Sequence, residues 1–436
     1  MKKLGLHWQI IIGMVAGLLL GALFLLFPWG KGFVVDWIKP FGTIFINSLK
    51  LIAIPLIIAS LIKGVSDLND IRQLSKMGTR TIGIYIITTI VAISLGLLLV
   101  NTVKPGRFIA ESTRTEMMQS FSSEADTRIS KAAETQEQGP LQALIDIIPE
   151  NIVAAASSNG NMLQIIFFVV FFGIGMILIE PEKAKPVKAF FDGLNEVILK
   201  MIDVIMLAAP YGVFALLATL MVEAPSADVF IALGAYALTV IAGLLILLFL
   251  FYPTVVKIFT GLSFKQFLNG ISPAQLLAFS TSSSAATLPV TMERVEEHLG
   301  VEKDVVAFVC PVGATINMDG TSLYQGIAAV FIAQVFGNDL TFTDQLVIVL
   351  TATLASIGTA AVPGAGILML VIVLESIGVN PAGIALIFAV DRPLDMIRTA
   401  VNVTSDATVA LLVGKSLGKL KEPKVKNWND HYKPVD

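Results

Sequence analysis

The sequence predicts an all-α polytopic membrane protein, and two observations carry that prediction. Of its 436 residues, 55% are hydrophobic and only 14% are charged, whereas a soluble domain carries about 25% charged residues. Apolar runs of about 20 residues, the length of helix that crosses a bilayer, recur along the chain. No soluble core could bury so much apolar sequence, so we expect lipid to surround most of the protein.

Apolar runs before residue 260 are long enough to span a bilayer. They cover residues 8–28, 40–66, 80–103, 163–180, 190–220 and 228–256. The first follows Met1-Lys2-Lys3 and lacks a clean cleavage site, so we expect a retained transmembrane helix and not a signal peptide. Beyond residue 260, Ser, Thr, Gly, Pro and Asp interrupt the apolar stretches, which indicates an irregular membrane region.

Basic residues in short loops predict the orientation, because cytoplasmic loops carry an excess of Lys and Arg. With a cytoplasmic N-terminus, one side of the membrane receives Lys2, Lys3, Lys63, Arg72, Lys76, Arg80, Lys183, Lys185, Lys188, Lys257, Lys265, Lys415, Lys419, Lys421, Lys424 and Lys426. Residues 104–162 then form a polar extracellular loop, and both termini are cytoplasmic. The net charge of −3 gives no basic surface for nucleic acid.

Two segments carry apolar arms that are too short to span a bilayer. Residues 266–296 surround a run from Ser280 to Ser284, and residues 343–378 surround Ser356 to Gly366. We interpret both as re-entrant hairpins, each followed by a longer helix, at about 302–336 and 380–414. If they enter from opposite sides, the two units are inverted repeats, an arrangement typical of secondary transporters. Ordinary helix pairs with loops in water are the alternative.

A polar stripe in residues 391–406 is the strongest functional signal. Asp391, Asp395, Arg398, Asn402 and Asp406 recur at steps of 4, 3, 4 and 4, so they share one face of a helix. Charged residues at membrane depth must meet partners or water. A structural charge network is the alternative to a binding site.

A broken helix is the second signal. Gly313 to Thr321 reads Gly-Ala-Thr-Ile-Asn-Met-Asp-Gly-Thr, and these residues interrupt a membrane helix and free its carbonyl groups. Carbonyls beside carboxylates favour a hard cation such as Na⁺ or K⁺, and the scattered Cys310 and His residues give no transition-metal pattern. Tyr85, Thr88 and Thr89 form a weaker signal within an apolar span, because hydroxyls often bond their own helix.

The charges in these segments predict a cation-coupled carrier and not an enzyme. Asp319, Asp391, Asp395 and Asp406 outweigh Arg398 by three charges, so cations must enter for the site to be stable, and a solute can follow by reciprocal coupling. Arg398 suits one carboxylate, Asp395 an ammonium and Asn402 a second carboxylate. Together they indicate an acidic amino acid.

At these motifs the chain resembles the dicarboxylate/amino acid:cation symporter family, which includes the bacterial and archaeal homologues of excitatory amino acid transporters. The motifs are Ser282 to Ser284, Asn317 to Thr321, Val362 to Gly366 and Asp395 to Asp406, and the resemblance covers nearly the whole chain. It implies eight transmembrane helices with two inverted re-entrant hairpins, assembled as a homotrimer in the cell membrane.

The resemblance also implies a division into domains. Residues 1–66 and 163–220 would hold scaffold helices 1, 2, 4 and 5. Helix 3, at 67–103, would join residues 221–436 in a transport domain that moves like an elevator. That domain would contain helix 6, both hairpins, helices 7 and 8, and a cytoplasmic tail.

The resemblance further implies residue roles. Substrate would contact Ser282, Ser284, Thr321, Val362, Gly366, Asp395, Arg398, Thr399 and Asn402. Co-transported Na⁺ would contact Tyr85, Thr88, Thr89, Gly313, Thr315, Asn317, Asp319, Ser356, Ile357, Thr359, Asn402 and Asp406. Relatives carry an arginine at positions that here are Ser282 or Met396, so the partner of Asp395 in the empty site is left open.

Several other functions are alternatives to a sodium-coupled acidic amino acid symporter. They are a proton-coupled symporter, a carrier of neutral amino acids or C4-dicarboxylates, an intramembrane aspartyl protease and an ion channel. A protease needs two carboxylates that share a proton, and the spread stripe of acids fits that need poorly. The full set of oxygen ligands favours sodium over protons, and the sequence does not separate aspartate from glutamate as substrate.

Overall fold

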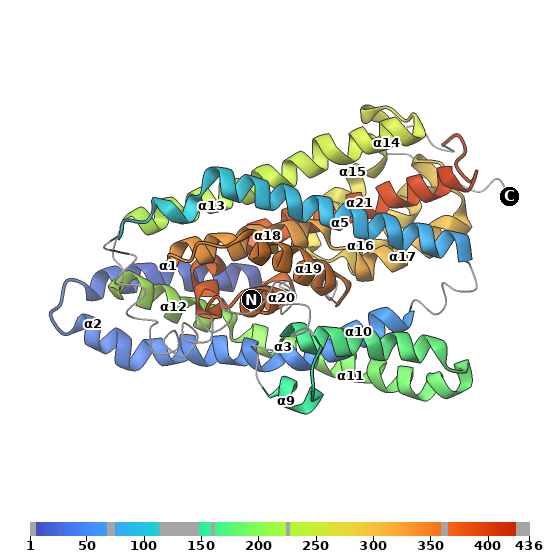
Figure 1. Ribbon diagram of the computed structural model, residues 1–436. Coiled ribbons are helices and arrows are strands. Elements are labelled where there is room, and N and C mark those ends of the chain that lie inside the picture. Colours follow the sequence, from blue (N-terminus) through green and yellow to red (C-terminus); the bar gives the residue numbers. More distant parts are fainter. Residues whose placement is uncertain are drawn as a thin grey trace, which may run out of the picture.

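Helices make up the regular structure of the computed structural model, which describes residues 6–67, 75–111, 113, 148–157, 162–223, 227–358 and 365–423. Figure 1 shows that most of the long helices run along one long direction of the molecule. Within the described ranges the one extended pairing is an isolated bridge between Val301 and Leu420. The prediction of an all-helical chain is confirmed.

Five helices pack together as a first group, drawn in blue and green along the lower side of Figure 1. They are α1 (Leu6–Phe24), α3 (Lys39–Asp67), α10 (Met162–Leu178), α11 (Pro181–Leu207) and α12 (Ala209–Glu223). Gly13, Gly17 and Gly21 lie on one face of α1, where added Cβ atoms would collide with α12. Such small residues allow membrane helices to approach closely.

The predicted span 190–220 differs from the structure. It is divided between α11, which begins at Pro181, and α12, and the two helices meet at Ala208. Pro210 lies in the first turn of α12, where a missing N–H leaves no hydrogen bond unmade. The proline therefore marks a break that an apolar run alone does not reveal.

The remaining long helices form a second group around α21 (Ile384–Ser416). Its members are α5 (Ser75–Val103), α13 (Ala227–Ile246), α14 (Tyr252–Thr260), α15 (Phe264–Thr281), α16 (Ser284–Glu293), α17 (Lys303–Ile316), α18 (Asp319–Val335), α19 (Phe342–Gly358) and α20 (Ala365–Ser376). In the apolar stretch of α21, 83% of the residues are buried, against 39% in those of α5 and α13. The polar stripe of α21 therefore lies inside protein.

Each predicted hairpin range contains two helices that pack against each other, α15 with α16 and α19 with α20. Ser282 ends α15 in a left-handed conformation with φ 51°, and the Ser283 hydroxyl accepts a hydrogen bond from Ala286 N to begin α16. Residues 359–364, between α19 and α20, lie outside the described residues. The longer arm of each pair has 18 or 17 residues.

Three described helical stretches are long and apolar enough to cross a membrane, namely Lys76–Phe108, Asp228–Thr260 and Val390–Ser416. Shorter apolar helices occur at Ile12–Phe24, Ile54–Lys63, Gln164–Leu178, Ala209–Thr219 and Phe342–Ile357. Of the predicted loop 104–162, the structure describes the short helices η2 (Pro105–Phe108) and α9 (Ile152–Ala156). Residues 112, 114–147 and 158–161 lie outside the described part.

Candidate functional site

The candidate site is built around the break between α17 and α18. Asn317 and Met318 leave helical geometry there, which exposes backbone groups that need partners. Asn402 on α21 accepts a hydrogen bond from Gly320 N at 2.8 Å, and Ser356 on α19 accepts one from Met318 N at 3.1 Å. Side chains from two other helices therefore hold the break open, as the sequence predicts for a broken helix.

Asp319 at the start of α18 is completely buried and surrounded by hydroxyl groups. Its carboxylate accepts hydrogen bonds from Thr89 at 2.6 Å, Ser405 at 2.7 Å and Tyr252 at 2.8 Å. These donors come from α5, α21 and α14. Neutral hydroxyl groups therefore satisfy the hydrogen bonds of this acid. None of them carries a positive charge that would compensate the carboxylate.

Asp406 on α21 lies on the other side of the break. It accepts a hydrogen bond from Asn317 Nδ2 at 2.7 Å and is 1% exposed. A Cβ atom on Gly313 would collide with both the Asp406 carboxylate and the Tyr85 hydroxyl. The glycine is required because the carboxylate and the hydroxyl occupy the space where a side chain would stand.

We call Asp319, Asp406 and their oxygen-bearing neighbours Thr89, Tyr252, Asn317 and Ser405 the acid cluster. In the described part of the chain, neither aspartate forms an ion pair with Lys, Arg or His, and no group of three or more His, Cys, Asp and Glu side chains is arranged to hold a metal. Two carboxylates among hydroxyl and amide oxygens suit a hard cation.

A second set of charged side chains lies on α21. Arg398 is fully buried, and its guanidinium contacts Asp391 at 3.0 Å and Asp395 at 2.8 Å. Arg392 contacts the other oxygen of Asp395 at 3.2 Å. We call these four residues the arginine quartet, and their formal charges sum to zero. Arg392 thus supplies a partner for Asp395 that the sequence analysis left open.

The Arg398 guanidinium also lies against an aromatic ring and a glycine. Its central carbon is 3.8 Å from the centroid of the Tyr324 ring, a cation–π contact. A Cβ on Gly366 would be 3.5 Å from the guanidinium and 2.9 Å from Thr321 Cγ2. Gly366 belongs to the first turn of α20, where backbone N–H groups lack helical partners and favour anions.

The predicted substrate residues are only partly gathered by described contacts. Arg398, Asp395, Thr321 and Gly366 lie together, and Asn402 reaches Thr321 Oγ1 at 3.5 Å. Thr399 donates to the Asp395 carbonyl of its own helix. The buried Ser282 and Ser284 lie at the tip between α15 and α16. Both of these helices pack on α21. Val362 lies outside the described residues.

Most of the predicted cation residues surround the break. They are Tyr85, Thr89, Gly313, Asn317, Asp319, Asn402 and Asp406. Ser356 ties α19 to it and also donates to the Ile316 carbonyl at 3.2 Å. Thr88 and Thr315 donate to carbonyls of their own helices. Ile357 is half-buried beside Ser356, and Thr359 lies outside the described residues.

Sequence reasoning missed four residues of these two sets, namely Tyr252, Ser405, Tyr324 and Arg392. Ser405 precedes Asp406 on a buried helix, and Arg392 stands three positions before Asp395. The spacing of three brings the Arg392 and Asp395 side chains together on a helix, so Arg392 had a local signal, whereas Ser405 contacts Asp319 on another helix. Tyr252 and Tyr324 reach Asp319 and Arg398 only through the packing of separate helices.

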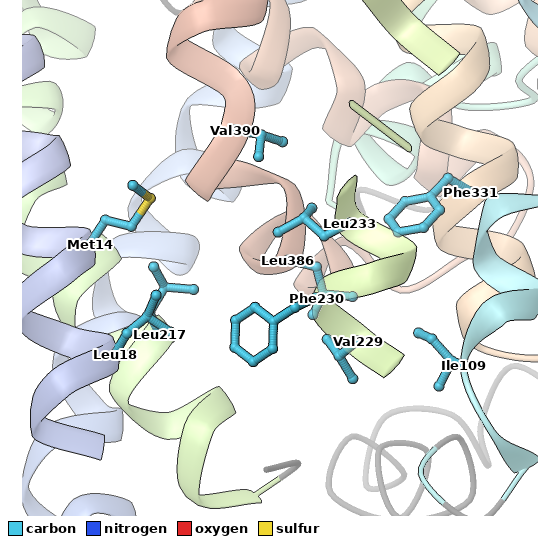
Figure 2. A pocket seen from close by; sticks show the side chains of 10 residues that line it. All are labelled: Met14, Leu18, Ile109, Leu217, Val229, Phe230, Leu233, Phe331, Leu386 and Val390. Carbon is cyan, nitrogen blue, oxygen red and sulfur yellow. The ribbon is translucent and has the colours of Figure 1, made fainter. Parts of the chain in front are cut away.

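An apolar cavity of about 200 Å³ lies between the two groups of helices. Figure 2 shows Met14 and Leu18 of α1 and Leu217 of α12 facing Phe230 and Leu233 of α13 across it. Among the described residues, no charged side chain lines the cavity. It therefore does not suit a charged solute.

Comparison with known proteins shows relatives along the whole chain. The model of the sodium:dicarboxylate symporter family matches residues 6–416. The chain is 36% identical to the proton/sodium-glutamate symport protein of Geobacillus stearothermophilus over 98% of both chains. It is 35% identical to the proton/glutamate-aspartate symporter of Escherichia coli, covering 95% of this chain and 93% of the relative.

A relative from an animal gives a similar result. The rat excitatory amino acid transporter 2 is 34% identical, and the match covers 92% of this chain and 77% of that one. The polar stripe, the broken helix and the serine-rich tip all lie within the region matched by the family model. This chain therefore belongs to the sodium:dicarboxylate symporter family.

Proposed function

We propose that this protein takes up the acidic amino acids L-aspartate and L-glutamate together with Na⁺. One observation carries the proposal: the charge-balanced arginine quartet lies on the same helix as Asp406, which belongs to an acid cluster with no cationic side chain among the described residues. The quartet offers both charges that an amino acid needs, and the acid cluster attracts cations. The names of the relatives, which include glutamate and sodium, support the same function.

Substrate binding requires an exchange of partners within the quartet. Arg398 contacts Asp391 and Asp395 in this structure. A substrate carboxylate that binds Arg398 therefore takes the place of the Asp395 carboxylate on the guanidinium. The ammonium group then takes the Asp395 oxygen that Arg398 releases. Because each charged group exchanges one partner for another of the same charge, no unpaired charge is exposed at membrane depth.

Cations and substrate stabilise each other through the broken helix. Asn402 contacts both Gly320 N and Thr321, while Asn317 in the same break contacts Asp406. A cation at the acid cluster therefore orders the segment that supports the substrate side. Coupling of this kind is reciprocal, because each ligand favours the arrangement that the other binds.

The larger architecture of the proposal comprises eight transmembrane helices, two inverted re-entrant hairpins and a homotrimer in the bacterial inner membrane. Both termini are cytoplasmic. Residues 67–103 and 221–436 move as a transport domain against a scaffold of 1–66 and 163–220, in an elevator-type cycle. The packing of α5 on α18, within the second group of helices, supports this division.

Uptake by the purified protein in liposomes tests the function. We expect labelled aspartate or glutamate to accumulate only with an inward sodium gradient, and a matched potassium gradient serves as the control. Uptake driven equally well by a pH gradient without sodium would contradict sodium coupling. Unlabelled aspartate and glutamate, added in competition, determine which one is preferred.

Proton coupling is the second candidate function. The E. coli relative is named a proton symporter, and Asp319 and Asp406 are buried acids with no described cationic partner. Protons would neutralise them as Na⁺ does. A pH gradient that drives uptake in sodium-free buffer would identify this candidate.

A further inference from the structure

Asp395 has both of its carboxylate oxygens occupied in this structure. Arg398 Nη2 donates to Oδ1 at 2.8 Å, and Arg392 Nη1 donates to Oδ2 at 3.2 Å. Two guanidinium groups therefore share one carboxylate. Only the contact with Arg398 must be given up when Arg398 binds a substrate carboxylate, so Asp395 keeps a cationic partner with substrate bound.

Arg392 differs from Arg398 in its surroundings. The Arg392 side chain is 23% exposed, whereas Arg398 is completely buried. Arg392 Nε has no hydrogen-bond partner among the described residues. The contact with Asp395 spans three positions of α21, with Pro393 between them, so it is local to one helix and does not depend on the packing of other helices.

From this geometry we infer that Arg392 determines how strongly the site selects for an amine. This inference rests on the proposed function. An ammonium group bound to Asp395 stands beside the Arg392 guanidinium, and two positive charges at that separation repel each other. Arg392 also keeps Asp395 neutralised when the solute carries no amine. Arg392 therefore disfavours acidic amino acids relative to dicarboxylates that lack the amine.

Competition binding tests the inference with L-aspartate and with succinate, a four-carbon dicarboxylate without an amine. Unlabelled L-aspartate or succinate is added to displace labelled aspartate from the purified full-length protein in saturating sodium. We expect Arg392→Gln to raise the preference for aspartate over succinate about tenfold, because an unpaired Asp395 then penalises succinate. Arg392→Lys keeps the positive charge and should leave this preference close to that of the wild-type protein.

Two controls separate selectivity from general damage. Arg107→Gln removes an arginine from an exposed ion pair with Asp339 and should leave the preference unchanged. In an Asp395→Asn background, adding Arg392→Gln should change the preference by less than about twofold, because the shared carboxylate is gone. Thermal unfolding of each variant reports whether the protein is folded.

The results that overturn the inference are distinct from failure of the proposed function. If Arg392→Gln weakens both ligands by the same factor, changes neither, or lowers the preference for aspartate, Arg392 does not set the selectivity for an amine. A wild-type protein that retains no labelled aspartate in sodium would instead contradict the proposed function.

Discussion

The acid cluster and the arginine quartet both place two aspartates at buried positions, yet they treat the charges differently. In the quartet, two guanidinium groups balance Asp391 and Asp395. In the acid cluster, Asp319 and Asp406 receive only neutral donors. Burying a carboxylate without a counter-charge costs free energy, so binding of a cation stabilises the acid cluster.

This difference refines the charge argument made from the sequence. From the sequence, three excess negative charges were expected at one site, without a contribution from Arg392. The structure pairs two of the four acids with Arg392 and Arg398, and it leaves two negative charges in the acid cluster. Cation demand and solute recognition are therefore separated along α21, with Asn402 between them.

Asp406→Asn should have the largest effect, because it removes one of the two uncompensated charges. We expect the sodium concentration for half-maximal uptake to rise about 100-fold. Aspartate affinity at saturating sodium should change much less. Sodium titration of uptake in liposomes measures both quantities, and Asp339→Asn on the exposed surface is the matched control. An unchanged titration would remove Asp406 from the cation site.

Arg398→Cys tests the quartet in the same way. Loss of the guanidinium should weaken acidic amino acids by about 30-fold or more, while neutral amino acids, which present no side-chain carboxylate, should lose far less. Competition against labelled substrate with a panel of acidic and neutral amino acids measures the difference. An equal loss for both classes would assign Arg398 a structural role only.

Tyr252→Phe should have the smallest effect of the three substitutions. It deletes one of three hydroxyl donors to Asp319 and preserves the ring. One such hydrogen bond contributes about 1 kcal/mol, so we expect the half-saturating sodium concentration to change by about fivefold or less. Tyr211→Phe, on the exposed face of α12, is the control. A shift as large as that of Asp406→Asn would mean that the tyrosine does more than solvate the acid.

Much of the architecture was predictable because membrane helices have characteristic local sequence patterns. The broken helix appeared as Asn317-Met318-Asp319-Gly320, and the polar face of α21 appeared in its spacing of four and three. The break at Ala208 was not predicted, although Pro210 marks it. The glycines at positions 13, 17 and 21 were also a usable signal for close packing of α1.

Sequence alone is sufficient to predict that the chain is helical and membrane-embedded, and that acids and an arginine share one helix face. Those properties follow from composition and from periodicity within single segments. Tertiary packing was needed to show which neutral side chains surround the buried charges. The contacts of Asp319 with Tyr252 and of Arg398 with Tyr324 join helices far apart in the chain, and such contacts depend on how helices pack, which no local pattern encodes.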